Sequence, residues 1–299
     1  MSASKRFLHP DAIRRITRLD LRAKQIVEGF LSGTHRSPFF GQSIEFLQHR
    51  EYVPGDDLRH VDWKVWARQD RLYVKQFEEE TNLRCYLLVD RSRSMEYVNR
   101  SYSKYEFACT LAACLGYLVL KQQDAIGGIT FDNQVRDVVP VSNSQNQLSN
   151  FVESLAETTE RDASNWESIF AKATEIVPRK GMMLIFSDVL GDVSQMLRGL
   201  RLLCQAGHDV AVIHVLDDDE LDFEFEGPVR FEDLESPGQL ACNPKALRAG
   251  YLDAVQEFLQ QIRHGIVAAG IQYKLVRTSQ NFGAVLSEFL TERLAKNRH

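Results

Sequence analysis

Three oxygen-bearing side chains follow one another at every second position in the stretch LLVDRSRSM: Asp90, Ser92 and Ser94. In an extended segment, residues two apart project to the same side, so one carboxylate and two hydroxyls can converge just beyond the end of a strand. Hard oxygen donors of this kind suit a cation such as Mg²⁺, or a site of phosphate transfer. The alternative is a serine-rich turn that caps the next helix, and the motif alone does not decide between these readings.

The elements that must position these residues follow from the hydrophobic pattern after position 84. Continuous apolar runs predict buried strands, and segments of helical periodicity separate them. We expect strands at 84–90, 125–131, 134–140, 182–187, 209–216 and 271–277. We expect helices at 104–122, 145–156, 166–176, 193–206, 247–269 and 282–294. This alternation predicts an α/β fold, Rossmann-like, with a mostly parallel sheet covered by helices on both faces.

Two further polar positions lie where such a sheet binds ligands. In open parallel sheets, ligands sit beyond the carboxyl ends of the strands, near the point where strand order reverses. Asp188 follows the strand 182–187 in the stretch FSDVLGD, at the same edge as Asp90. Ser164 precedes the helix 166–176 in the stretch RDASNWESI, where a serine alone is an ordinary helix N-cap.

Taken together, these residues resemble the metal-ion-dependent adhesion site of von Willebrand factor A-type domains. That site has D-x-S-x-S after the first strand, then a loop bearing Thr, then an Asp after a later strand. The middle loop here is Asp162-Ala163-Ser164, in which serine keeps the hydroxyl. The resemblance implies a von Willebrand factor A-like fold and a site for Mg²⁺ or Mn²⁺, with Ca²⁺ as an alternative. Its ligands would be Asp90, Ser92, Ser94, Ser164 and Asp188.

Composition and other motifs exclude several classes of protein. The net charge of −5 argues against general nucleic-acid binding, and the five scattered cysteines form no C-x-x-C pair. The apolar stretch 107–120 is too short to span a bilayer, and the N-terminus has no apolar core of a signal peptide. We therefore expect a cytoplasmic protein. The sequence has no G-x-S-x-G, P-loop or H-E-x-x-H motif, and Ser92 stands where a haloacid-dehalogenase-like phosphatase has its acid.

The stretch REYVPGDDLRHVDWKVWARQDRLYVKQFEEE, residues 50–80, is dense in Arg, Asp, Trp and Tyr. We interpret it as a structural segment with ion pairs rather than a catalytic one. The combination of this stretch with the A-type domain that follows it resembles the bacterial family called domain of unknown function 58. The resemblance covers the chain from about residue 32 onward and implies a form without membrane spans. Such proteins are similar to those encoded beside MoxR-type AAA+ ATPases, which implies such an ATPase or its client as the partner.

These observations predict two parts of the chain and one leading function. Residues 1–83 would hold a helix at about 10–29 and the signature segment, packed on a core of residues 84–299. Residues 217–235, with ten acidic residues and one arginine, fit a solvated excursion better than a partner surface. The leading function is a non-enzymatic, metal-dependent protein-binding module. A metal-dependent hydrolase, with Glu96 or Asp132 as weak candidates for a base, and a scaffold with a degenerate metal site are the alternatives.

Overall fold

The computed structural model describes residues 18–33, 46–53, 65, 72–77, 83–98, 102–156, 166–225, 229–232, 239–242 and 244–296. The chain divides into two compact units, and residues 34–82 form the second one. The first unit contains residues 1–33 together with residues 83–299. It therefore draws on two separate stretches of the sequence, and it carries the elements that position the site.

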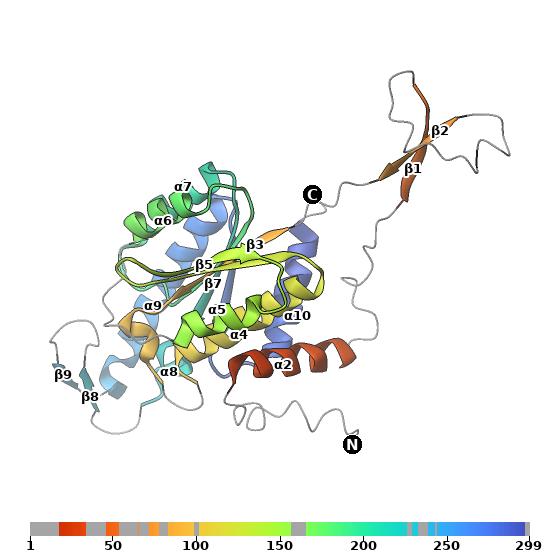
Figure 1. Ribbon diagram of the computed structural model, residues 1–299. Helices are drawn as coiled ribbons and strands as arrows, with labels where there is room; N and C mark the ends of the chain where they lie inside the picture. The colour runs from red at the N-terminus through yellow and green to blue at the C-terminus, as the bar shows by residue number, and fades with distance from the viewer. Residues whose placement is uncertain are drawn as a thin grey trace. The chain divides into compact units, whose positions relative to one another are not determined.

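A six-stranded sheet is the centre of the first unit (Figure 1). Its strands lie in the order β10 (Gln272–Arg277), β7 (Asp209–Leu216), β6 (Met182–Ser187), β3 (Arg84–Asp90), β4 (Ala125–Phe131) and β5 (Val135–Ser142). All neighbouring strands are parallel except β4 and β5, which are antiparallel. β3, the first strand of this sheet in the sequence, lies between β4 and β6, so strand order reverses beside it. The predicted α/β fold with a mostly parallel sheet is confirmed.

The strand bounds largely match those expected from the apolar runs. β3, β4, β6 and β7 have the expected bounds, because each is a run buried after its first residue, and a polar residue ends it or follows it. β10 and β5 begin one residue later than expected, and β5 continues to Ser142. Pro140 lies inside it, which is tolerated because β5 is an edge strand and one of its sides forms no ladder.

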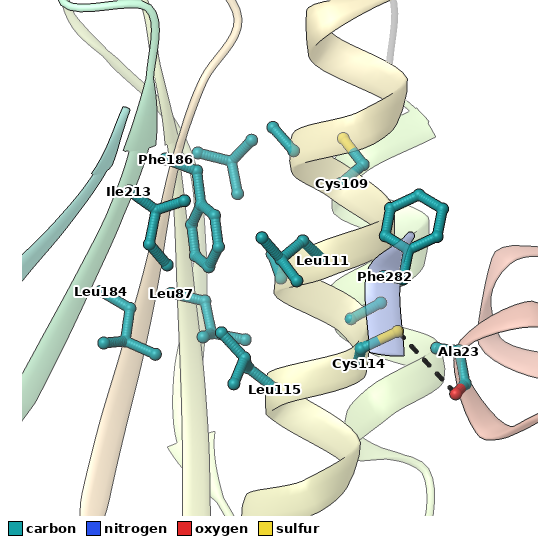
Figure 2. Packing of buried hydrophobic residues seen from close by; sticks show 14 of the residues in the cluster. Ala23, Leu87, Cys109, Leu111, Cys114, Leu115, Leu184, Phe186, Ile213 and Phe282 are labelled. Atoms are coloured by element: carbon teal, nitrogen blue, oxygen red, sulfur yellow. Dashed lines mark hydrogen bonds between the residues drawn. The ribbon is translucent and has the colours of Figure 1, made fainter. Parts of the chain in front are cut away.

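Helices cover both faces of the sheet. One face packs against α4 (Lys104–Lys121), α5 (Gln147–Ala156) and α10 (Phe282–Lys296), as Figure 2 shows for α4. The other face packs against α6 (Trp166–Ile176), α7 (Val193–Gln205) and α9 (Pro244–Ala268). Successive residues of a strand point to opposite faces of the sheet. Leu87 belongs to the first core cluster, which lies under α4, α5 and α10, and Leu88 belongs to the second, under α6, α7 and α9. The sheet is thus buried on both sides.

Helix α4 is buried almost all round because a further helix covers it. α2 (Leu19–Gly33) buries Ala23, Ile26 and Val27 in the same cluster as α4. Figure 2 shows Ala23 of α2 beside Cys114 of α4. The thiol of Cys114 on α4 donates to the carbonyl oxygen of Ala23 at 3.9 Å. A helix was expected at about 10–29; residues 10–17 lie outside the described part, and the helix continues to Gly33. In the part of the chain that the structure describes, no helix is long and apolar enough to cross a membrane.

Short elements complete the two units. The first unit has a 3₁₀ helix, η3 (Arg93–Glu96), a short helix, α8 (Asp218–Asp222), and an antiparallel hairpin of β8 (Val229–Glu232) and β9 (Gln239–Cys242). The second unit has an antiparallel pair, β1 (Phe46–Glu51) and β2 (Tyr73–Phe77). Most of the signature segment 50–80 lies outside the described residues. Its packing on the core and the boundary at residue 83 therefore stay predictions.

Candidate functional site

Asp90, Ser92 and Ser94 converge at the carboxyl end of β3, as their spacing predicts. Asp90 is the last residue of the strand, and the two serines lead into η3. The hydroxyl oxygens of Ser92 and Ser94 lie 3.1 Å apart. The amide of Ser92 donates to Oδ1 of Asp90 at 2.8 Å, which fixes the carboxylate relative to the turn. All three side chains are buried, so their oxygen atoms form a compact and ordered group.

Asp188 follows β6, the strand beside β3, and lies at the same edge of the sheet. The residue before it connects the two strand ends: Ser187 donates its hydroxyl to Oδ2 of Asp90 at 2.6 Å. Ser187 Oγ also accepts the amide of Val189 at 2.8 Å. Val189 has a φ of 53°, which is rare and costly for a β-branched residue, and such strain concentrates at functional sites. The turn after β6 is thus held in a strained conformation beside Asp90.

The fifth expected ligand, Ser164, lies outside the described residues, as does the loop 157–165 that carries it. Within the described part of the chain, no three His, Cys, Asp or Glu side chains are grouped so that they could hold a metal ion. A cation at this edge would therefore depend on the hydroxyls of Ser92 and Ser94 as well as on the two aspartates. That the five residues bind a metal stays a prediction.

The electrostatics of the edge favour a cation. Burial, reinforced by the charge of Asp188, raises the pKa of Asp90 to about 7, although its hydrogen bonds to Ser187 and Ser92 act in the opposite direction. A nearby positive charge stabilises the ionised form of a carboxylate that is costly to ionise for these reasons. Two carboxylates and two hydroxyls are also the donor types that Mg²⁺ and Mn²⁺ prefer. The residues at this edge thus fit a divalent cation.

The structure adds a buried lysine that the sequence analysis missed. Nζ of Lys104, the first residue of α4, lies 2.8 Å from Oδ2 of Asp188 and 2.6 Å from Oε1 of Glu220 on α8. These partners are 84 and 116 positions away in the sequence. The sequence did contain a signal. A lysine in the first turn of a helix interacts unfavourably with the helix dipole, which indicates that a negatively charged partner compensates for it.

His214 is a second residue that only the structure brings to the site. Its Nε2 lies 2.8 Å from the carbonyl oxygen of Asp188, and its Nδ1 lies 2.8 Å from the hydroxyl of Tyr273. A carbonyl can only accept, so Nε2 carries the proton and Nδ1 accepts from Tyr273. Burial lowers the pKa of His214 to about 4, so the imidazole is neutral at pH 7. It anchors the backbone of Asp188 without adding charge.

The expectation that the acidic run 217–235 is a solvated excursion is wrong for its first part. Asp217 and Asp219 are buried, because each carboxylate has a hydroxyl donor: Thr278 bonds Asp217 at 2.6 Å and Tyr97 bonds Asp219 at 3.0 Å. Asp222 is half-buried and pairs with Arg277. Long-range partners, which composition does not reveal, fold this part into α8 and place it beside Lys104.

Arg91 alternates with the site residues along the chain, so its side chain leaves the strand on the opposite side. It is fully buried, and its Nη1 donates to Oδ2 of Asp137 on β5 at 2.9 Å. Asp132 is a weak candidate for a catalytic base. Both of its carboxylate oxygens accept from Nε of Arg136, at 2.7 and 2.8 Å. These two arginine–aspartate pairs lie around the neighbouring strands β4 and β5. The Arg91–Asp137 pair joins the end of β3 to β5, and the Arg136–Asp132 pair closes the turn between β4 and β5.

The chain is similar to several known proteins. An uncharacterized protein of Mycobacterium tuberculosis is 27% identical over 290 residues, which is 95% of this chain and 90% of that protein. The solved structure of BatB from Bacteroides thetaiotaomicron is 17% identical, with a TM-score of 0.46, and covers 70% of this chain and 98% of its own. The SpRpn10 VWA domain is 10% identical, with a TM-score of 0.43, and covers 69% of this chain and 94% of its own.

The family comparison is decisive, because its match spans most of the chain. It includes the described strands from β3 to β7 as well as part of the signature segment. Residues 48–260 match the family described as "Protein of unknown function DUF58", and the chain belongs to that family.

Proposed function

We propose that this protein is a non-enzymatic, divalent-metal-dependent protein-binding module. The observation that carries the proposal is the convergence of Asp90, Ser92 and Ser94 at the reversal point of the sheet, beside Asp188. Asp90 and the two serines would hold Mg²⁺ or Mn²⁺ with Ser164 and Asp188. A bound cation there supplies an open coordination position for an acidic side chain of another protein. Two aspartates only balance a doubly charged ion, so an incoming carboxylate would meet little repulsion.

Exposed apolar side chains next to these residues favour a protein as the ligand. Leu190, two residues after Asp188, is 40% exposed, and Val98, just after η3, is 54% exposed. Apolar groups around a polar centre are typical of protein-binding surfaces. The strained backbone of Val189 fixes the turn that presents Leu190. An acidic residue with an apolar neighbour is therefore the ligand chemistry that this edge would recognise.

The partner follows from the family resemblance rather than from the geometry. The resemblance implies a protein similar to those encoded beside MoxR-type AAA+ ATPases, so we propose such an ATPase or its client as the partner, in an adaptor or maturation role. A cytoplasmic location remains part of this proposal. The hydrolase alternative is less well supported, because Asp132 is engaged by Arg136 and Glu96 is exposed.

Calorimetric titration with Mg²⁺ and Mn²⁺ tests the metal site. We expect modest affinity in the wild-type protein, since Mg²⁺ keeps much of its water, and no measurable binding in Asp90→Ala. Asp253→Ala, which removes an exposed aspartate from α9, is the matched control and should bind like the wild type. Binding that persists unchanged in Asp90→Ala would show that the ligands were wrongly assigned.

A pull-down tests the partner. The cognate MoxR-type ATPase should be recovered with the wild-type protein in Mg²⁺, and should be lost in EDTA or with Ser92→Ala. Equal recovery in all three samples would rule out a metal bridge and leave the family membership untouched. Turnover of generic phosphoester or peptide substrates in the presence of metal would instead favour the hydrolase.

A further inference from the structure

Lys104 is a buried cation placed where a cation is costly. Its side chain is 1% exposed, and it occupies the first turn of α4, where the helix dipole favours negative charge. Burial alone would lower the pKa of Lys104, yet the charges of Asp188 and Glu220 outweigh it and raise the pKa. The ammonium therefore remains charged and depends on these two carboxylates.

The charges around Lys104 are unbalanced. Lys104 pairs with two carboxylates, on Asp188 and Glu220, and the buried carboxylate of Asp90 lies beside Asp188, so the one ammonium offsets only one of these three charges. With all four groups ionised, the remainder of two negative charges equals the charge of one divalent cation. Lys104 is thus the resident cation of this edge, and a divalent cation would neutralise the negative charge that Lys104 leaves.

The two partners of Lys104 are held independently of it. Glu220 Oε2 accepts the amide of Asp217 at 2.8 Å in the capping box of α8, which leaves Oε1 for the ammonium. Asp188 Oδ1 accepts the amide of Leu190 at 3.3 Å, which leaves Oδ2 for the ammonium. Loss of either ion pair would leave Lys104 with the other one. The geometry therefore allows the ammonium to leave Asp188 and stay on Glu220.

We infer that Lys104 is a built-in competitor of the divalent cation for Asp188, and that Glu220 is the carboxylate that retains the ammonium when the metal binds. This inference rests on the proposed function, because it concerns the same site. Lys104 then keeps the metal affinity modest. It also links occupancy of the site to α8, since Glu220 belongs to that helix. Lys104 and Glu220 act on the metal through Asp188 and are positioning residues rather than ligands.

The first test is calorimetric titration of the full chain with Mg²⁺ or Mn²⁺ alone. Lys104→Met should bind metal about tenfold more tightly than the wild type, because a charge-assisted hydrogen bond to Asp188 no longer has to be broken. Lys274→Met is the matched control. Lys274, on β10, also pairs with two glutamates, Glu288 at 2.9 Å and Glu292 at 2.7 Å, which both lie on α10. Its metal affinity should equal that of the wild type. Equal affinities of Lys104→Met and the wild type would overturn the inference.

A double-mutant cycle separates competition from a simple change of charge. Glu220→Gln should weaken metal binding several-fold in the wild type, because Lys104 then has only Asp188 as its partner. If Glu220 acts through Lys104, the same change should have little effect in the Lys104→Met background. An equal loss of affinity in both backgrounds would mean that Glu220 acts through its charge alone, and would overturn its assigned role.

A crystal structure of the wild-type protein with Mn²⁺ keeps the inference testable if Lys104→Met does not fold. Nζ of Lys104 should remain on Glu220 and should have left Oδ2 of Asp188. A bound metal beside an intact Lys104–Asp188 pair would overturn the inference while confirming the metal site. Metal binding by Lys104→Met but not by the wild type would support the competitor and refute the proposed function. Binding by neither protein would refute both.

Discussion

At the residue scale, His214 shows how one buried side chain can make folding sensitive to pH. The pKa of a histidine in an unfolded chain is about 6.5, and burial lowers that of His214 to about 4. Between these values the unfolded chain binds a proton that the folded protein does not. The stability that His214 contributes is therefore complete above about pH 6.5 and is lost as the pH falls towards 4. The bond that Nδ1 accepts from Tyr273 requires the neutral ring, because a protonated Nδ1 can no longer accept.

The direction of this pH dependence predicts how the variant His214→Gln should behave. At pH 7 the variant should be less stable than the wild type by about 1–3 kcal/mol, because a buried hydrogen-bonded pair is disrupted. That difference should shrink by about 2 kcal/mol between pH 6.5 and pH 5, since only the wild type must keep an imidazole neutral. Urea unfolding in EDTA at several pH values measures it. A difference that is constant over this range would mean that His214 does not titrate on unfolding.

At the element scale, the contact between β4 and α5 depends on a residue with no side chain. A Cβ atom on Gly128 would lie 2.3 Å from Cδ2 of Phe151, which is buried in the first core cluster. No L-residue fits there unless the Phe151 ring moves. Gly250, within α9, is the opposite case, because a Cβ there would have no neighbour within 4 Å. The same substitution should therefore have opposite effects at the two positions.

We expect Gly128→Ala to lower the free energy of unfolding by about 1–3 kcal/mol, as overpacking of a core does. We expect Gly250→Ala to raise it by up to about 1 kcal/mol, because alanine favours a helix interior over glycine. Thermal and urea unfolding of both variants measure the two effects. A stabilised Gly128→Ala would mean that α5 can shift away from the sheet at little cost.

At the scale of the whole molecule, the first unit is assembled from two stretches of the chain. Residues 1–33 belong to it together with residues 83–299, and α2 buries Ala23, Ile26 and Val27 in its core. Burial of one valine or isoleucine side chain stabilises a fold by about 1.5–3 kcal/mol. The boundary at residue 83 expected from the sequence would separate α2 from the helix that it covers.

A fragment of residues 83–299 should therefore be less stable than the full chain by about 3–6 kcal/mol, since two such side chains lose their partners and α4 becomes exposed. Replacement of residues 34–82 by a flexible linker keeps α2 and is the control, which should retain most of that stability. Urea unfolding of the three proteins measures the difference. If the fragment is as stable as the full chain, the expected boundary is a sound one and α2 adds little.

Most strands of the sheet and three positions of the candidate site could be predicted from the sequence alone. Buried parallel strands are continuous apolar runs, so β3, β4, β6 and β7 could be bounded from the pattern alone. The period of two in an extended chain sufficed to bring Asp90, Ser92 and Ser94 together, because their separation is local. Where a helix or strand ended at an edge or a cap, as in β5, α9 and α2, the bounds differed by one to four residues.

Only the tertiary structure decided which charges meet. Lys104, Asp188 and Glu220 are far apart in the sequence, and nothing local in the pattern relates them. The acidic residues at the start of 217–235 likewise look solvated in the sequence, yet hydroxyl and arginine partners from Tyr97, Thr278 and Arg277 bury or pair them. Hydrophobic periodicity records which face of an element is covered, whereas ion pairs depend on how elements are placed in space. That is why the fold could be inferred from the sequence and the charge network of the site could not.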